Sequence, residues 1–206
     1  DQTTSGESLV NMMDLDLLVG SGGVLSHAPR REQSAKMLID AFMPEGITQL
    51  AVDSIFMMPQ LGVLAHVDKK EFSEEARKAA LEVFHKDCLI RLGTCITPIG
   101  KAKPGEIILN AVLTLADGSI KEQELISGEI IRLEAPYEPM KAILKPSKNM
   151  DIGGGKGQEI QANIFGGTVG LIFDGRDRPI TIPANQEKRL ESIRSWSDAL
   201  NEYPTS

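Results

Sequence analysis

The run from Asp16 to Leu25 constrains this chain more than any other stretch. It places three apolar residues of strand type directly before a glycine-rich turn made of Gly20, Ser21, Gly22, Gly23 and Val24. Glycine has no Cβ, so this turn can adopt positive φ and bend sharply at the carboxyl end of the strand. Ligands of open parallel α/β sheets bind at that end. The run predicts either a tight structural turn or a turn whose backbone contacts a ligand.

Strand and helix patterns alternate around this turn. Residues 15–19 and 47–52 are apolar runs of strand length, whereas residues 31–43 and 69–86 repeat apolar side chains at helical spacing. Pro59 suits the first turn of another helix. Such alternation predicts a parallel sheet with right-handed crossovers.

The pattern changes after residue 87, where short β-branched runs follow one another closely. Asp117-Gly118 between two such runs predicts a hairpin. Residues 186–201 carry apolar side chains at helical spacing. We therefore expect an α/β unit at 1–87 and a mainly β domain at 88–206, an antiparallel barrel or sandwich with a C-terminal helix. The expected strands of this second domain are 88–99, 107–115, 120–126, 129–133, 140–144, 160–164, 169–173 and 179–182.

Composition excludes several classes of protein. The net charge of −7, with most of the acidic excess in residues 1–87, argues against a general nucleic-acid binder. No apolar run is long enough to span a bilayer, so we expect no membrane partner. Cys88 and Cys95 lack the close pairing of metal ligands, and the three histidines are scattered, so no metal site is predicted. Two cysteines form no disulfide framework, and we expect reduced, buried thiols in a cytoplasmic protein.

Further glycine and charge clusters have simple structural interpretations. Residues 153–157 contain Gly-Gly-Gly-Lys-Gly but lack the spacing of a phosphate loop, so a loop between strands is predicted. The glycines of residues 165–170 indicate a bulge or close packing. Residues 174–178, Asp-Gly-Arg-Asp-Arg, are typical of a charged hairpin tip. Asp53 follows a predicted strand, where it can meet a ligand or cap the next helix, and we favour the cap.

We find no arrangement of residues that predicts catalysis by this chain alone. Gly20-Ser21-Gly22 lacks the Gly-x-Ser-x-Gly spacing of a hydrolase nucleophile. The carboxylates are plentiful, but none is placed by the sequence beside a partner of defined role. The candidate site is therefore a binding site rather than a catalytic one.

Several stretches carry a resemblance to known families. Residues 15–67 resemble the last strand–helix–strand–helix portion of the actin-like, sugar-kinase and heat-shock ATPase superfamily, with a Gly-Gly turn after a strand and a later Gly-containing helix. The chain as a whole resembles the glutamate mutase accessory (MutL-like) proteins, which are unrelated to the mismatch-repair protein of similar name. This second resemblance rests on residues 20–29, 92–100, 151–153 and 166–172.

The resemblance implies an ATP-dependent, chaperone-like reactivating factor for an adenosylcobalamin-dependent mutase. It implies that Gly20 to Val24 contact adenosine. The phosphate loops and catalytic acid of the superfamily lie upstream in full-length members, and the chain begins with Asp1, so we expect a C-terminal portion that binds ATP or ADP only with the upstream lobe. The β-rich half is the expected mutase-binding module.

Two other functions remain to be weighed. In one, the chain is a protein-binding module and the glycine turn is only structural. In the other, it is a reductive activator of corrinoid proteins, a related ATPase type. That activator would need an iron–sulfur cluster, and two cysteines cannot supply four thiolate ligands.

Overall fold

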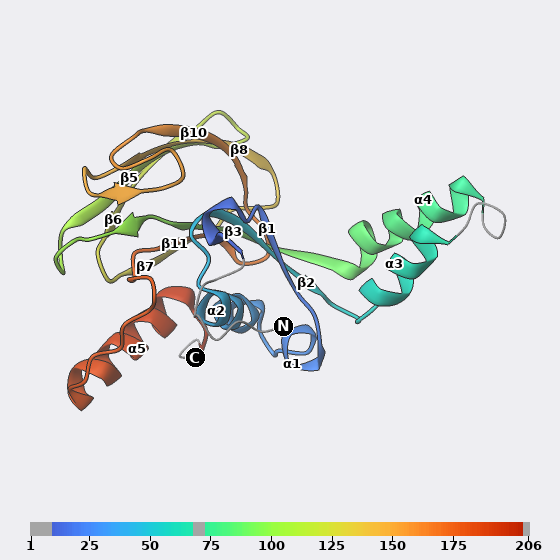
Figure 1. Ribbon diagram of the computed structural model, residues 1–206, viewed down its shortest axis with the longest axis horizontal. Coiled ribbons are helices and arrows are strands. Elements are labelled where there is room, and N and C mark those ends of the chain that lie inside the picture. The colour runs from blue at the N-terminus through green and yellow to red at the C-terminus, as the bar shows by residue number, and fades with distance from the viewer. Residues whose placement is uncertain (1–9, 68–72, 204–206) are drawn as a thin grey trace.

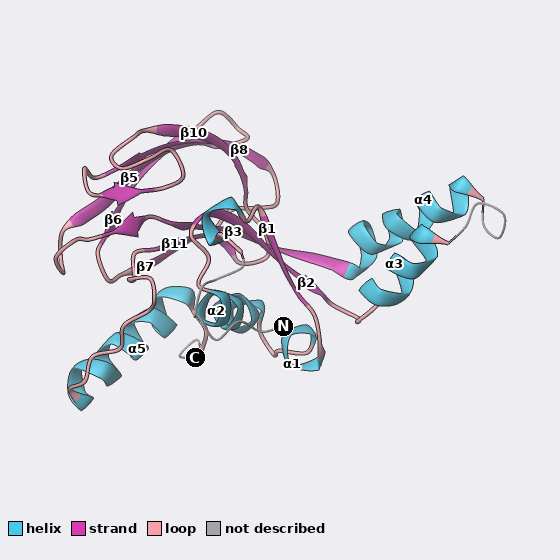
Figure 2. Cartoon of the chain, in the orientation of Figure 1, coloured by secondary structure: helices cyan, strands magenta, loops and turns pink. Residues whose placement is uncertain are grey.

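The computed structural model describes residues 10–67 and 73–203, which form three layers and a projecting helical arm (Figure 1). A five-stranded sheet lies in the middle, a four-stranded antiparallel sheet covers one of its faces, and helices cover the other (Figure 2). The predicted class, α/β together with a mainly β part and a C-terminal helix, is confirmed. The two facing sheets form an open sandwich, and the described residues contain no closed barrel.

The middle sheet is mixed. Its strand order is β1-β2-β3-β11-β7, with β1 parallel to β2, β3 parallel to β11, and the other two pairs antiparallel. Both faces are covered, which explains why β11 is buried throughout. The strands are β1 (Leu17–Gly20), β2 (Gly46–Asp53), β3 (Leu89–Thr97), β7 (Ile130–Leu133) and β11 (Gly170–Asp174).

The prediction of a parallel sheet in residues 1–87 is confirmed for β1 and β2. Strand β3, which belongs to the part expected to be mainly antiparallel, runs antiparallel to β2. After β2 the chain forms two helices that run out and back, α3 (Met58–His66) and α4 (Glu74–Val83). A π-helical turn, Phe84–Cys88, follows α4. Because the two helices return the chain to the end where β2 finished, β3 must run in the opposite direction. Ser54 closes the base of this arm, since its backbone N–H and its hydroxyl both donate to the Cys88 carbonyl at 2.8 Å.

The second sheet supplies most of the hydrophobic core that lies between the two sheets. Its order is β10-β8-β5-β6, entirely antiparallel, and the predicted hairpin joins β5 to β6. At the turn, Asp117 accepts a hydrogen bond from the Ser119 N–H at 2.9 Å, and Gly118 has φ of 82°. The strands are β5 (Ile107–Thr114), β6 (Ile120–Ile126), β8 (Pro139–Pro146) and β10 (Ile160–Phe165), and a separate pair is formed by β4 (Ile99–Gly100) and β9 (Met150–Asp151).

Two helices cover the opposite face of the middle sheet. These are α2 (Arg31–Phe42) and α5 (Gln186–Leu200), both close to their predicted ranges. Asn185 caps α5 by accepting from the Lys188 N–H at 3.0 Å. The remaining short helices are α1 (Gly23–Ser26) and a 3-10 turn, Met12–Asp14. The helices pack on one core, which joins Leu38 and Ile39 of α2 to Leu92, Ile172 and Trp196.

The structure differs from the predicted elements at residues 179–182 and at the end of the helix predicted over 69–86. Residues 179–182 form no strand, because the chain leaves the sheet after β11 and crosses to α5. The predicted helix over 69–86 is present as α4 and the π-helical turn, while its first residues lie outside the described part of the chain. Strands from both sides of residue 87 pair within the middle sheet, and the division into 1–87 and 88–206 stays a prediction.

Candidate functional site

The glycine-rich turn lies where the sequence predicts, at the carboxyl end of a strand with a parallel neighbour. Strand β1 ends at Gly20, which pairs with Val52 of β2. Gly22 has φ of 107° and precedes α1, whose first residue is Gly23. This φ lies in the region that L-residues with a side chain rarely adopt, so glycine fits the position.

The glycines of this turn have two different roles. A Cβ on Gly20 would lie 2.8 Å from Leu25 Cδ1 and 2.9 Å from Leu38 Cδ2, so this glycine permits α1 and α2 to pack closely on the strand. A Cβ on Gly22 or Gly23 would meet no atom within 4 Å. The backbone of these two residues therefore faces open space. Val24 beside them is 75% exposed and adds an apolar side chain to the same surface.

Asp53 lies at the end of β2 and is fully buried. Its carboxylate accepts hydrogen bonds from the N–H groups of Met57, at 3.1 Å, and Met58, at 2.9 Å, which open α3. Ser21 Oγ donates to the same carboxylate at 3.4 Å, and Ser26 Oγ donates to the Asp53 carbonyl. Asp53 thus caps α3, as favoured from the sequence, and it also ties the glycine turn to the base of the helical arm.

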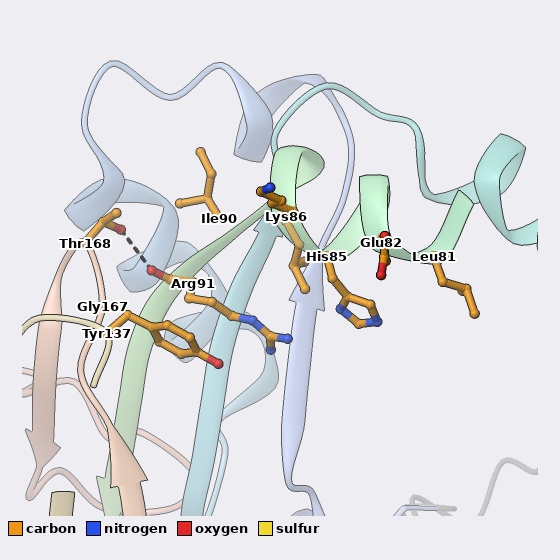
Figure 3. A pocket seen from close by; sticks show the side chains of 10 residues that line it. Leu81, Glu82, His85, Lys86, Ile90, Arg91, Tyr137, Gly167 and Thr168 are labelled. Atoms are coloured by element: carbon orange, nitrogen blue, oxygen red, sulfur yellow. Dashed lines mark hydrogen bonds between the residues drawn. The ribbon is translucent and has the colours of Figure 1, made fainter. Parts of the chain in front are cut away.

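A notch of about 1030 Å³ opens where this arm meets the layered body, and sequence reasoning missed it. Its walls come from α4 and the π-helical turn, the start of β3, Tyr137, and the loop before β11 (Figure 3). The Arg91 guanidinium lies 5.8 Å from the centroid of the Tyr137 ring, which stacks on Phe165 at 5.4 Å between centroids. The lining residues are Leu81, Glu82, His85, Lys86, Leu89, Ile90, Arg91, Tyr137, Gly167 and Thr168.

The other glycine clusters are structural, as predicted. In the 153–157 loop, the Asp151 carboxylate accepts from the N–H groups of Gly153, at 2.8 Å, and Gly155, at 3.0 Å. A Cβ on Gly166 would lie 2.2 Å from the carbonyl oxygens of Ala135 and Pro136, and one on Gly167 would lie 2.4 Å from Leu92 C. The backbone is too close at both positions for any side chain.

The charged residues after β11 do not form an exposed hairpin tip, so that prediction is wrong. Asp174 and Arg176 are buried, with Arg176 Nη2 2.8 Å from Asp174 Oδ2. Arg178 Nη2 contacts the same carboxylate oxygen at 2.8 Å, and Arg176 Nη1 reaches Asp40 of α2 at 2.8 Å. Burial alone would raise the pKa of Asp174, but the hydrogen bonds and charges of Arg176 and Arg178 outweigh it and hold that pKa below its ordinary value. The cluster joins β11 to α2 and is structural.

Both cysteines are free and buried, as predicted. Burial, reinforced by the negative charge of Asp174, raises the pKa of the Cys95 thiol to about 12. The described residues contain no group of three or more potential metal-ligating side chains. Within the same residues, no helix combines the length and apolarity needed to cross a bilayer.

Comparison with known proteins adds one finding for the part of the chain that holds the glycine turn. A family model described as MutL protein matches residues 2–87. The MutL match includes β1, the glycine turn, β2 and the helical arm, and it supports the MutL-like resemblance for this part of the chain. It also fits an accessory role for the chain beside a glutamate mutase. No curated protein and no solved structure matches the chain.

Proposed function

We propose that this chain is the adenosine-contacting part of an ATP-dependent reactivating factor that serves an adenosylcobalamin-dependent mutase. The observation that carries the proposal is the open backbone at Gly22 and Gly23, at the carboxyl end of a strand with a parallel neighbour. The MutL match over the same residues supports a mutase as the partner.

The turn suits a flat ligand for a simple physical reason. With no side chain at Gly22 or Gly23, a purine ring can lie directly on the main chain, and exposed Val24 offers it an apolar contact. Asp53 fixes the turn from below through Ser21 and through the start of α3. The surface is therefore held in place before any ligand arrives, which reduces the entropy lost on binding.

The turn, Gly20 to Val24, contains no cationic side chain for the phosphates of a nucleotide. The Gly-rich loop at 153–157 is held by Asp151 and follows β9, which pairs with β4 and not with β1 or β2. We therefore expect phosphate contacts and ATP hydrolysis to need the upstream lobe that the family resemblance implies, and we expect this chain by itself to bind adenine nucleotides weakly.

Such a factor would act by shifting a conformational equilibrium. A nucleotide held between two lobes favours the closed state only to the extent that it binds that state more tightly. The β-rich half, which shares the middle sheet with β1 and β2, would pass this change to the mutase. Loss of mutase capture on replacement of exposed Ile120 and Ile143 of the four-stranded sheet by serine in the longer protein is the expected result, and unchanged capture would contradict it.

The decisive experiment replaces Gly23 by valine. Gly23 has open space around its Cβ position and no positive φ, so Gly23→Val fills the turn without strain. Gly62 in α3 is equally open, and Gly62→Val is the matched control. Titration of the longer protein, which includes the upstream lobe, with a fluorescent adenine nucleotide should give saturable binding. Gly23→Val should weaken this binding by about tenfold or more, and Gly62→Val should leave it unchanged. Equal binding by both variants would rule out contact at the turn.

A second candidate function rests on the helical arm. Its residues include several exposed apolar side chains, and α3 has none that is buried. Such a surface is typical of a protein-binding module, in which the glycine turn would be only structural. Absence of any nucleotide binding at millimolar concentration, together with mutase capture lost on substitution of Phe56 and Val63 by serine, would favour this function.

A further inference from the structure

We infer that the notch at the base of the helical arm binds a small organic anion, one that carries a phosphate or carboxylate on a flat apolar group. This site is separate from the glycine turn, and the inference does not depend on the nucleotide proposal. Its residues come from α4, the π-helical turn, β3 and the loops around Tyr137 and Thr168.

The charges that line the notch favour an anion. The cations Arg91 and Lys86 and the imidazole of His85, a hydrogen-bonding group, line it with the single carboxylate of Glu82, in a chain whose net charge is −7. Among the described residues no carboxylate is paired with Arg91, whose charge meets only the Tyr137 ring. Figure 3 shows the Arg91 guanidinium and the His85 ring directed into the same space, with the Tyr137 hydroxyl beside them. A guanidinium matches the two oxygens of a carboxylate or phosphate.

The geometry holds these groups in place. The backbone of Arg91 is held by the loop before β11, where Thr168 donates to the Arg91 carbonyl through its N–H, at 3.0 Å, and its hydroxyl, at 3.2 Å. Tyr137 is supported from behind by the Phe165 ring. His85 comes from the π-helical turn, an irregularity that is frequent at functional sites.

The rest of the lining sets the class of ligand. Leu81, Leu89 and Ile90 give the notch an apolar wall, and the Tyr137 ring offers a flat face. An inorganic anion would leave this wall in contact with water. A phosphate or carboxylate attached to an aromatic ring would use both the wall and the cations, and the volume is in the range of small-molecule sites.

The test uses phenyl phosphate and benzoate as probes and benzyl alcohol as the neutral control. Titration of the full chain, followed by the amide NMR signals of Arg91, Gly167 and Thr168, should show saturable binding of at least one anion with a Kd on the order of 1 mM, and no saturation with benzyl alcohol. Saturation by phenyl phosphate alone or by benzoate alone would assign the anionic group. No saturable shift with either anion, or equal binding of benzyl alcohol, would overturn the inference.

Two variants give opposite expected effects. Arg91→Met keeps an unbranched side chain without the guanidinium and should weaken binding of the anions about tenfold. Glu82→Gln removes a repelling charge from an exposed position and should strengthen their binding by about two- to threefold. Arg189→Met, on the exposed side of α5, is the control for loss of one positive charge. Unchanged binding in Arg91→Met, or weaker binding in Glu82→Gln, would contradict the assignment.

Competition with ADP separates this site from the glycine turn. If ADP leaves phenyl phosphate binding unchanged, or displaces it equally in the unmodified chain and in Gly23→Val, the notch is an independent site, as inferred. If ADP displaces phenyl phosphate and Gly23→Val abolishes that displacement, the two sites are one, and the inference of a separate site is wrong.

Discussion

The guanidinium of Arg176 lies 5.0 Å from the centroid of the Trp196 ring, and this contact joins the end of the central sheet to the C-terminal helix. The same guanidinium is bonded to Asp174 at the end of β11 and to Asp40 on α2. One side chain therefore connects β11, α2 and α5. Trp196 is itself fixed, since its Nε1–H donates to the Gly128 carbonyl at 2.9 Å.

Replacement of Arg176 by methionine should be strongly destabilising. The variant leaves the buried Asp174 carboxylate with Arg178 as its one charged partner among the described residues, and loss of one partner of a buried ion pair costs about 3–5 kcal/mol of the free energy of unfolding. Urea denaturation followed by the fluorescence of Trp196, the single tryptophan, measures the change directly. Arg189→Met on the exposed side of α5 should change stability by less than about 0.5 kcal/mol, and equal midpoints for the two variants would contradict the role given to Arg176.

The depressed pKa of Asp174 predicts how stability responds to acid. The unfolded chain protonates this carboxyl near pH 3.9, as aspartate usually does, whereas the folded chain does so only at lower pH. Its stabilising contribution is therefore complete above about pH 5 and is lost as the pH falls through its folded pKa. Asp174→Asn should be less stable near pH 7, and its difference from the unmodified chain should shrink below about pH 4. The exposed neighbour Asp177 provides the control, and Asp177→Asn should change stability by less than about 0.5 kcal/mol near pH 7.

The raised pKa of Cys95 predicts the opposite dependence at alkaline pH. An unfolded thiol ionises near pH 8.5, while the folded one ionises only near pH 12, so the folded state is favoured fully below about pH 8.5. Above that pH the unfolded state loses a proton that the folded state keeps, and the free energy of unfolding falls by up to about 1.4 kcal/mol per pH unit. Cys95→Ala should remove this part of the slope between about pH 9 and about pH 10.5. Identical slopes for the two proteins would show that the thiol is not kept protonated by the fold.

Substitutions at Gly20, which is closely packed, and at Gly23, which is open, should have different effects on stability. Gly20→Ala places a Cβ against Leu25 and Leu38, and such overpacking costs about 1–3 kcal/mol. Gly23→Ala meets open space at the start of α1 and should be neutral or stabilising by up to about 1 kcal/mol. Thermal unfolding of both variants is the measurement. If Gly20→Ala unfolds at the same temperature as Gly23→Ala, the close packing of α1 and α2 on the strand is not as described.

The elements that were predicted correctly are those that depend on local sequence patterns. The strand before Gly20, the helix over 31–43, the Asp117-Gly118 hairpin and the helix over 186–201 are set by side-chain periodicity, caps and turn residues, all of which act between near neighbours in the chain. The capping role of Asp53 was also predictable, because a carboxylate after a strand commonly caps the next helix.

The misses all depend on contacts between distant residues. Strands β3 and β11 join β1 and β2 in one sheet, and periodicity does not encode this pairing of distant segments. Asp174 and Arg176 have the composition of an exposed turn, and their burial depends on contacts of Arg176 with distant residues, Asp40 on α2 and Trp196 on α5. The notch was not predicted because Arg91 and Tyr137 come together only in the folded chain. An arginine within an apolar, β-branched run was the one indication of it in the sequence.

The shared middle sheet predicts that residues 88–206 do not fold as a cooperative unit when expressed alone. Their strands β3 and β11 bury Leu92 and Ile172 against α2, which belongs to the first half, and β3 loses its β2 partner as well. A separate 88–206 chain would expose this face to water, so its thermal unfolding should be broad and its apolar surface should bind a reporter dye. Addition of a separate 1–87 chain should restore a sharp transition. A sharp transition for 88–206 alone would show instead that the antiparallel sheet and its core are sufficient, and that the predicted boundary at residue 87 also divides two folding units.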